Sequence, residues 1–172
     1  MLVKIVAIIL VVGSCTMIGF LLAKRYGQRV RELRMINSAL KHIETEIVYG
    51  LTPLPNAFYQ IAMRMEEPVR SVFSLMSERF HDHDLSTAEI WQNSWEVNQS
   101  KLALKKRDYD ILFQLGHSLG QTDRDNQVKH IGISLSYIQA EEEGARLDQQ
   151  KNEKMYQYLG FLTGIMIVIL MV

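Results

Sequence analysis

Two long stretches without charge, one at each end of the chain, restrict its fold more than any other feature. Residues 5–23 contain no carboxylate or amine side chain, and neither do residues 155–172. A helix needs about 20 apolar residues, with a range of about 17–25, to cross the hydrocarbon core of a bilayer. In the second stretch, Tyr156 and Tyr158 suit the headgroup level. We therefore expect an N-terminal transmembrane helix over residues 1–23 and a C-terminal one over residues 155–172.

The first stretch has an alternative interpretation as a cleaved signal peptide. Lys4 supplies a charged start, and the segment 12–15 resembles a lipoprotein cleavage box. The apolar region of a signal peptide typically has about 7–15 residues, whereas this stretch continues past Cys15 to Leu22. Its length therefore favours an uncleaved anchor.

Cations next to the apolar stretches predict the orientation of the chain. The first stretch is followed by a cluster of cations, the second is preceded by Lys151 and Lys154, and only Lys4 lies on the outer side. Cations collect on the cytoplasmic side of membrane helices. We expect residues 24–154 in the cytoplasm and both termini across the membrane. The cations after the first stretch are Lys24, Arg25, Arg29, Arg31 and Arg34.

The composition excludes several classes of protein. Residues 24–154 hold 37 of the 38 charged side chains, and the formal net charge of the whole chain is zero. This balance argues against a nucleic-acid-binding protein, which usually carries a basic surface. Cys15 is the only cysteine, so an intrachain disulfide is excluded. The two apolar ends also argue against a freely soluble enzyme.

Between the two stretches the sequence predicts helices only. Apolar residues step by three and four along one helical face: Leu33, Ile36, Leu40, Ile43 and Ile47. Ser86 and Glu89 form a capping box that opens a later helix, and its Trp91 and Trp95 are expected in the core. Since no segment alternates with a period of two, we expect an all-α fold, with a cytoplasmic helical bundle between the two transmembrane helices.

The last helix is expected to run from Arg124 into the membrane without a break. Its apolar stripe fades after Ile138, and residues 139–154 are mostly polar. A helix that is polar on nearly all sides lies in solvent rather than in a core, so this segment is predicted to be a stalk of about 24 Å. If it runs antiparallel to the first helix, the cations Arg31 and Arg34 come close to the anions Glu141, Glu142 and Glu143.

Small residues recur in both predicted transmembrane helices. Gly19 and Ala23 belong to a series with a spacing of four, and Gly160 and Gly164 form a GxxxG pattern. Small residues on one face let two membrane helices pack closely, although glycine is also simply common in such helices. Packing between the two helices is therefore one of two open interpretations.

A polar cluster near the start of the last helix is the candidate docking site. Asp123, Gln127 and His130 share a helix face by their spacing, and Arg124 lies beside them. A catalytic site would need a nucleophile or base beside a pocket, and no serine or cysteine partner accompanies these residues. They are expected to cap the helix or to contact a partner, and no catalytic residue is predicted.

The sequence predicts neither a metal site nor a cofactor site. The segment 81–84 reads His-Asp-His-Asp, but adjacent side chains point in different directions and no second cluster completes a coordination sphere. We interpret it as a solvated loop. The phosphate-binding glycine motifs of nucleotide-binding proteins are absent from the sequence.

Three long motifs follow one another in the order found in a known family. They read Leu33-x-x-Ile36-x-x-x-Leu40-x-x-Ile43-Glu44-x-Glu46-Ile47-x-Tyr49-Gly50-x-Thr52-Pro53-Leu54, then Gln114-Leu115-Gly116-x-x-Leu119-Gly120-x-x-Asp123-Arg124-x-x-Gln127-x-x-His130-Ile131, then Lys151-Asn152-Glu153-Lys154-Met155-x-x-x-Leu159-Gly160-Phe161-Leu162. With them the whole chain resembles the stage III sporulation protein AB family. Leu115 departs from the family pattern, which has phenylalanine there, and this apolar exchange puts little in doubt.

The resemblance implies a scaffold in endospore formation. The family belongs to an assembly that links mother cell and forespore, and its cytoplasmic part resembles the helical domain of the type II secretion F protein. The implied partners are a secretion-type cytoplasmic ATPase, other channel subunits and further copies of the chain. The implied location is the mother-cell membrane around the forespore. The alternative is a membrane-anchored sensor or regulator that binds a soluble ligand. A membrane hydrolase is disfavoured because the sequence offers no nucleophile.

Overall fold

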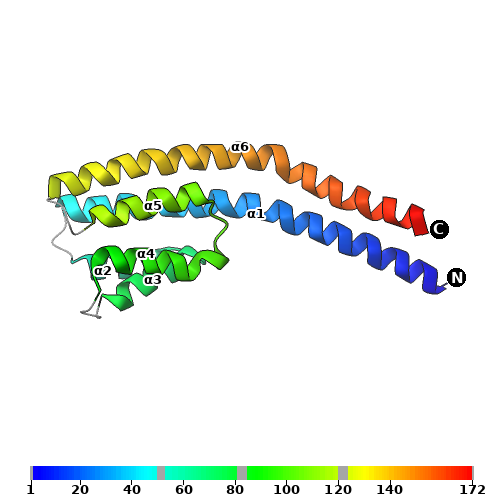
Figure 1. The fold of residues 1–172 in the computed structure, drawn as a ribbon, viewed down its shortest axis with the longest axis horizontal. Helices are drawn as coiled ribbons and strands as arrows, with labels where there is room; N and C mark the ends of the chain where they lie inside the picture. Colours follow the sequence, from blue (N-terminus) through cyan, green and yellow to red (C-terminus); the bar gives the residue numbers. More distant parts are fainter. Residues whose placement is uncertain (1, 50–52, 81–84, 120–123, 172) are drawn as a thin grey trace. The chain divides into compact units, whose positions relative to one another are not determined.

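The computed structural model describes residues 2–49, 53–80, 85–119 and 124–171, and every regular element in them is helical (Figure 1). The predicted all-α fold class is therefore confirmed. The 81–84 segment and the capping position Asp123 lie outside the described residues. The elements are α1 Leu2–Tyr49, α2 Leu54–Arg64, α3 Val69–Arg79, α4 Thr87–Asn98, the 3-10 helix η1 Gln99–Lys101, α5 Lys106–Ser118 and α6 Arg124–Met171.

The chain divides into two compact units. The two-helix unit consists of Met1–Val30 and Gly144–Val172, and the core unit consists of Arg31–Glu143. The long helices α1 and α6 each contribute one part to both units, because neither is interrupted within its bounds. Helices α2 to α5 belong to the core unit alone.

The core unit is built on the apolar face of α1. Leu33, Ile36, Leu40 and Ile43 are fully buried, as their spacing predicts, whereas Ile47 at the end of the stripe is half-buried. Apolar burial of this kind stabilises a protein by about 25 cal/mol for each Å² removed from water. The stripe therefore supplies one wall of the core.

An aromatic cluster contributed by α2, α3 and α4 fills the neighbouring part of the core. Trp91 and Trp95 are buried, which confirms the prediction for this pair, and both contact Phe73 edge to face. The ring centroids of Phe58 and Trp91 lie 6.0 Å apart. Such tilted and edge-to-face pairs are the preferred aromatic geometries.

The start of α4 shows the predicted capping box. The Glu89 backbone N–H donates to the Ser86 hydroxyl at 3.3 Å, and the Ser86 N–H donates to the Glu89 carboxylate at 2.8 Å. These bonds satisfy backbone groups that the first helical turn leaves open. The Ser86 hydroxyl also donates to the Glu89 carboxylate at 2.7 Å, and this bond, followed by that from the Ser86 N–H, holds the pKa of Glu89 below its usual value.

Gly116 in α5 makes room for Trp91. The Trp91 indole N–H donates to the Leu112 carbonyl at 2.7 Å, which fixes the ring against α5. A Cβ atom on Gly116 would lie 2.9 Å from Trp91 Cγ and closer still to Cδ1. The tight packing of α4 against α5 therefore requires glycine at this position.

Glycines also bring the helices of the two-helix unit into backbone contact. A Cβ atom on Gly160 would lie 2.8 Å from the Cys15 carbonyl oxygen and 2.9 Å from Gly19 Cα. One on Gly164 would lie 3.0 Å from Val12 Cα, and Ala23 on the same face of α1 as Gly19 is buried. Because these neighbours are mostly backbone atoms, no side-chain movement would make space for a larger residue.

The outer surface of the two-helix unit is apolar. Phe20, Leu21, Phe161 and Leu162 are all about half exposed or more. In the part of the chain that the structure describes, one helix is long and apolar enough to cross a membrane, the segment Ile9–Tyr49, whose best window has a mean hydropathy of 1.4. The second membrane helix remains a prediction.

We predict that Gly116→Ala destabilises the protein. Overpacking typically costs about 1–3 kcal/mol, and the better helix propensity of alanine offsets about 1 kcal/mol of it, so we expect a net loss of up to about 2 kcal/mol. The matched control is Gly132→Ala in α6, where a Cβ atom would meet nothing within 4 Å. Thermal unfolding of the full chain in detergent should show a lower Tm for the first variant and an unchanged or higher Tm for the second. Equal shifts would contradict the proposed clash with Trp91.

We predict that Gly160→Leu separates the helices of the two-helix unit, since its side chain would collide with the backbone of α1. The readout is a disulfide between the native Cys15 and Gly164→Cys, because a Cβ atom on Gly164 lies 3.3 Å from Cys15 Cβ, near the spacing of a disulfide. Oxidation in membranes should protect both thiols from maleimide labelling. Adding Gly160→Leu should restore labelling, whereas Gly13→Leu should not, because a Cβ atom on Gly13 meets nothing within 4 Å.

Candidate functional site

Of the polar cluster predicted at the start of α6, the structure describes the side chains of Gln127 and His130. Arg124 is the first residue of α6, although its side chain, like Asp123, lies outside the described part. Gln127 is half-buried and His130 is exposed. Since they are three residues apart on a helix, the two side chains lie on neighbouring positions of one face. This face of α6 is polar at both positions, and His130 is its exposed member.

Ion pairs connect α6 to other helices of the core unit. Arg34 of α1 donates to the Glu142 carboxylate at 3.0 Å, and Arg107 of α5 lies 2.9 Å from the Glu141 carboxylate. Arg31 and Glu143 are exposed. Of the three glutamates expected near Arg31 and Arg34, Glu142 thus pairs with Arg34 of α1, whereas Glu141 pairs with Arg107 of α5. The sequence prediction considered only α1 and α6 and did not include this cation. Both arginine side chains that form these pairs are largely exposed, so each pair contributes only about 0–1 kcal/mol.

A buried carboxylate on α1 is a feature that the sequence analysis did not single out. Glu32 is fully buried, and it accepts a hydrogen bond from the Ala103 backbone N–H at 2.7 Å. This bond joins α1 to the segment that leads from η1 into α5. The sequence did contain a signal, because Glu32 precedes Leu33 and lies four residues before Ile36, on the buried face of the helix.

A second buried carboxylate fixes the start of α5. Asp108 is fully buried and accepts a hydrogen bond from the Lys105 backbone N–H at 2.7 Å. Lys105 precedes α5, so this contact has the position of an N-terminal cap. The carboxylates Glu32 and Asp108 therefore have structural hydrogen bonds that hold α5 in place.

Tyr109 lies beside both carboxylates. Burial, followed by the negative charges of Glu32 and Asp108, raises the pKa of Tyr109 to about 12. Its hydroxyl is buried and has no hydrogen-bond partner among the described protein groups. The phenol therefore stays neutral at physiological pH, because burial beside negative charge disfavours the phenolate.

The polar groups Glu32, Asp108, Arg34 and Arg107 form contacts within the core unit. In the described ranges, no three histidine, cysteine, aspartate or glutamate side chains come together in a way that could hold a metal ion. The His-Asp-His-Asp segment 81–84 falls outside those ranges. In the core unit, buried hydrogen bonds and surface ion pairs hold α1, α5 and α6 in fixed positions relative to one another.

Comparison with known proteins assigns the chain to a family. The sequence profile of stage III sporulation protein AB matches residues 4–172. Stage III sporulation protein AB of Bacillus subtilis (strain 168) is 39% identical over 168 residues, which cover 98% of this chain and 98% of that protein. A solved structure of stage III sporulation protein AB superposes with a TM-score of 0.70 at 37% identity and covers 72% of this chain and 98% of its own. The chain therefore belongs to the stage III sporulation protein AB family, which supports a role in sporulation.

Proposed function

We propose that this protein is a non-enzymatic scaffold of a secretion-like channel that links mother cell and forespore during endospore formation. In this proposal the protein lies in the mother-cell membrane around the forespore, and its core unit docks a cytoplasmic ATPase. The contact between Gly19 and Gly160 is the observation that supports the membrane part of this proposal, and family membership supports its sporulation part. This contact makes the first and last parts of the chain one tightly packed pair with an apolar surface.

The exposed apolar side chains support a membrane location for both helices of that pair. Monomeric soluble proteins rarely expose large continuous apolar surfaces, and lipid would cover those of α1 and α6 alike. On α6 the exposed side chains are Leu159, Phe161, Leu162, Ile165, Met166 and Ile169. Two helices that cross as a pair anchor the intervening core unit on one side of the bilayer, as a platform requires.

The exposed polar surface of the core unit supports a docking role. Gln127 and His130, with Asp123 and Arg124 before them, are our candidates for the contact with the ATPase or with another channel subunit. The buried Glu32 and Asp108 hold α1 and α5 of the same core unit in a fixed arrangement. A rigid unit whose helices expose polar faces is suited to hold bound partners in fixed positions relative to one another.

We predict that both termini lie outside the cytoplasm. A reporter that works only in the cytoplasm should be silent when fused after Val172 and active when fused after Ser100, since the cations flanking both apolar stretches favour a cytoplasmic middle. Measurements of reporter activity at equal expression test this. Activity after Val172 with silence after Ser100 would reverse the orientation.

We predict that the full-length protein, solubilised from sporulating cells after crosslinking, retains a secretion-type ATPase identifiable by mass spectrometry. Arg124→Ala should reduce its recovery without lowering the Tm of the protein. The matched control is Lys129→Ala, which removes one positive charge from another face of the same helix. Failure of the wild-type protein to retain any such ATPase would contradict the docking proposal, and a large loss of Tm in Arg124→Ala would give this residue a structural role instead.

A further inference from the structure

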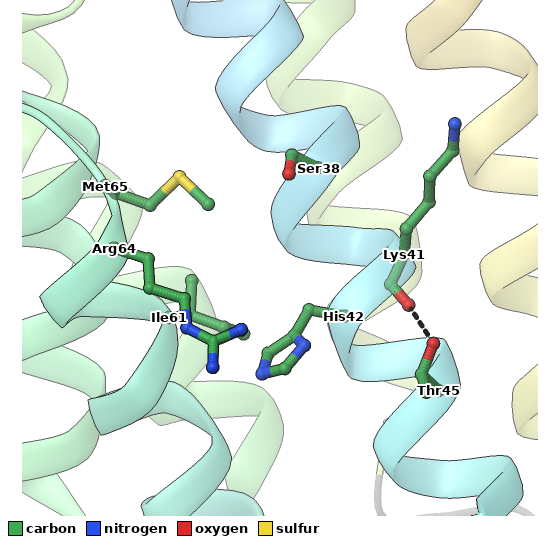
Figure 2. Close-up of a pocket in the computed structure, with 7 residues that line it drawn as sticks. All are labelled: Ser38, Lys41, His42, Thr45, Ile61, Arg64 and Met65. Carbon is green, nitrogen blue, oxygen red and sulfur yellow. Dashed lines mark hydrogen bonds between the residues drawn. The ribbon is translucent and has the colours of Figure 1, made fainter.

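A hollow of about 360 Å³ opens at the surface of the core unit between α1 and α2. Figure 2 shows the side chains that surround it. Helix α1 contributes Ser38, His42 and Thr45, and α2 contributes Ile61 and Arg64. Met65, directly after α2, completes one end.

Two side chains that can donate hydrogen bonds face each other across the hollow. The Arg64 guanidinium and the His42 imidazole point toward one another from the two helices (Figure 2). His42 Nε2 is buried, although the residue as a whole is half-buried, and this atom has no hydrogen-bond partner among the described protein groups. Buried polar atoms normally have a partner, so this nitrogen has capacity for a further bond.

The seven lining residues include no carboxylate that would neutralise these donors. The remaining basic side chain of the lining, Lys41, directs its ammonium group away from the hollow (Figure 2). The Thr45 hydroxyl is already committed, because it donates to the Lys41 carbonyl at 2.9 Å. The free donors of the hollow are thus those of Arg64, His42 and the exposed Ser38 hydroxyl.

The remaining wall is apolar. Ile61 is fully buried and Met65 is 9% exposed. An aliphatic wall beside a guanidinium and an imidazole matches a side chain that has a short methylene stem and a carboxylate head. A planar carboxylate also fits the fork of a guanidinium. Inorganic phosphate would use the same donors, but it would leave the apolar wall without a contact.

We propose that this hollow is a binding site for the carboxylate of a glutamate side chain presented by a partner protein. Arg64 binds the carboxylate through its guanidinium, and His42 donates its Nε2–H, which both the charged ring and one neutral tautomer carry. The stem of the glutamate packs against the exposed part of Met65. The site lies on α1 and α2 and uses none of the residues assigned above to the contact with the ATPase.

The test is a titration of the full-length protein in nanodiscs of neutral phosphatidylcholine at neutral pH. Nuclear magnetic resonance of histidine labelled at Cε1 follows the signal of His42, which the variant His42→Gln identifies. The probe is glutamate blocked at both backbone ends, and blocked glutamine is the matched neutral probe. Blocked glutamate should shift the His42 signal saturably, whereas blocked glutamine and an equal ionic strength of sodium chloride should not.

Substitutions then locate the binding site. Arg64→Gln should weaken the binding of blocked glutamate at least about tenfold, since hydrogen bonds to charged groups are among the strongest. Lys41→Gln also removes one positive charge near His42, but the Lys41 side chain points away from the hollow. This variant should bind blocked glutamate with unchanged affinity. Arg64→Lys keeps the positive charge but loses the two-pronged guanidinium. Its affinity for blocked glutamate should lie between those of wild type and Arg64→Gln.

Four results would overturn the proposal. They are the absence of any His42 shift with blocked glutamate, equal shifts with blocked glutamine or with chloride, equal weakening by Arg64→Gln and Lys41→Gln, and tighter binding of inorganic phosphate than of blocked glutamate. The last result would identify a phosphate site in place of a carboxylate site.

Discussion

The approach of Gly19 to Gly160 is the contact on which the two-helix unit depends. At this point no side chain separates the backbones of α1 and α6, and the tolerance for added volume is close to zero. In a membrane, helices gain little from hiding apolar side chains from one another, so close van der Waals packing through small residues becomes the main source of attraction. The glycines thus let two apolar helices act as one paired element while larger residues face outward.

The core unit depends on a different balance of forces. Its apolar residues, led by the α1 stripe and the aromatic cluster around Trp91, supply the driving force for packing. A few hydrogen bonds determine how the helices are placed against one another. The side chains of Glu32, Asp108 and Trp91 each bond to one defined backbone group. A buried carboxylate is tolerated only when such bonds compensate its loss of water, so these residues select one arrangement of α5.

The proposed scaffold role and the proposed glutamate site use different parts of the same unit. A scaffold needs exposed groups that are chemically specific yet held by a rigid frame. His130 on α6 and Arg64 on α2 are exposed, whereas their neighbours in the two proposed sites, Gln127 and His42, are half-buried. Membership in the stage III sporulation protein AB family supports a role in sporulation for the chain that carries both proposed sites.

The sequence by itself determined the all-α class, the buried stripe from Leu33 to Ile43, the capping box at Ser86 and the core position of Trp91. These features follow from periodicity and capping, which act over a few residues along one helix. Only the tertiary structure decided that Gly160 meets Gly19, that Glu141 pairs with Arg107, and that Arg64 faces His42. Each of these pairs joins segments far apart in the chain, and the choice of partner depends on how side-chain volumes pack together, which no local pattern encodes.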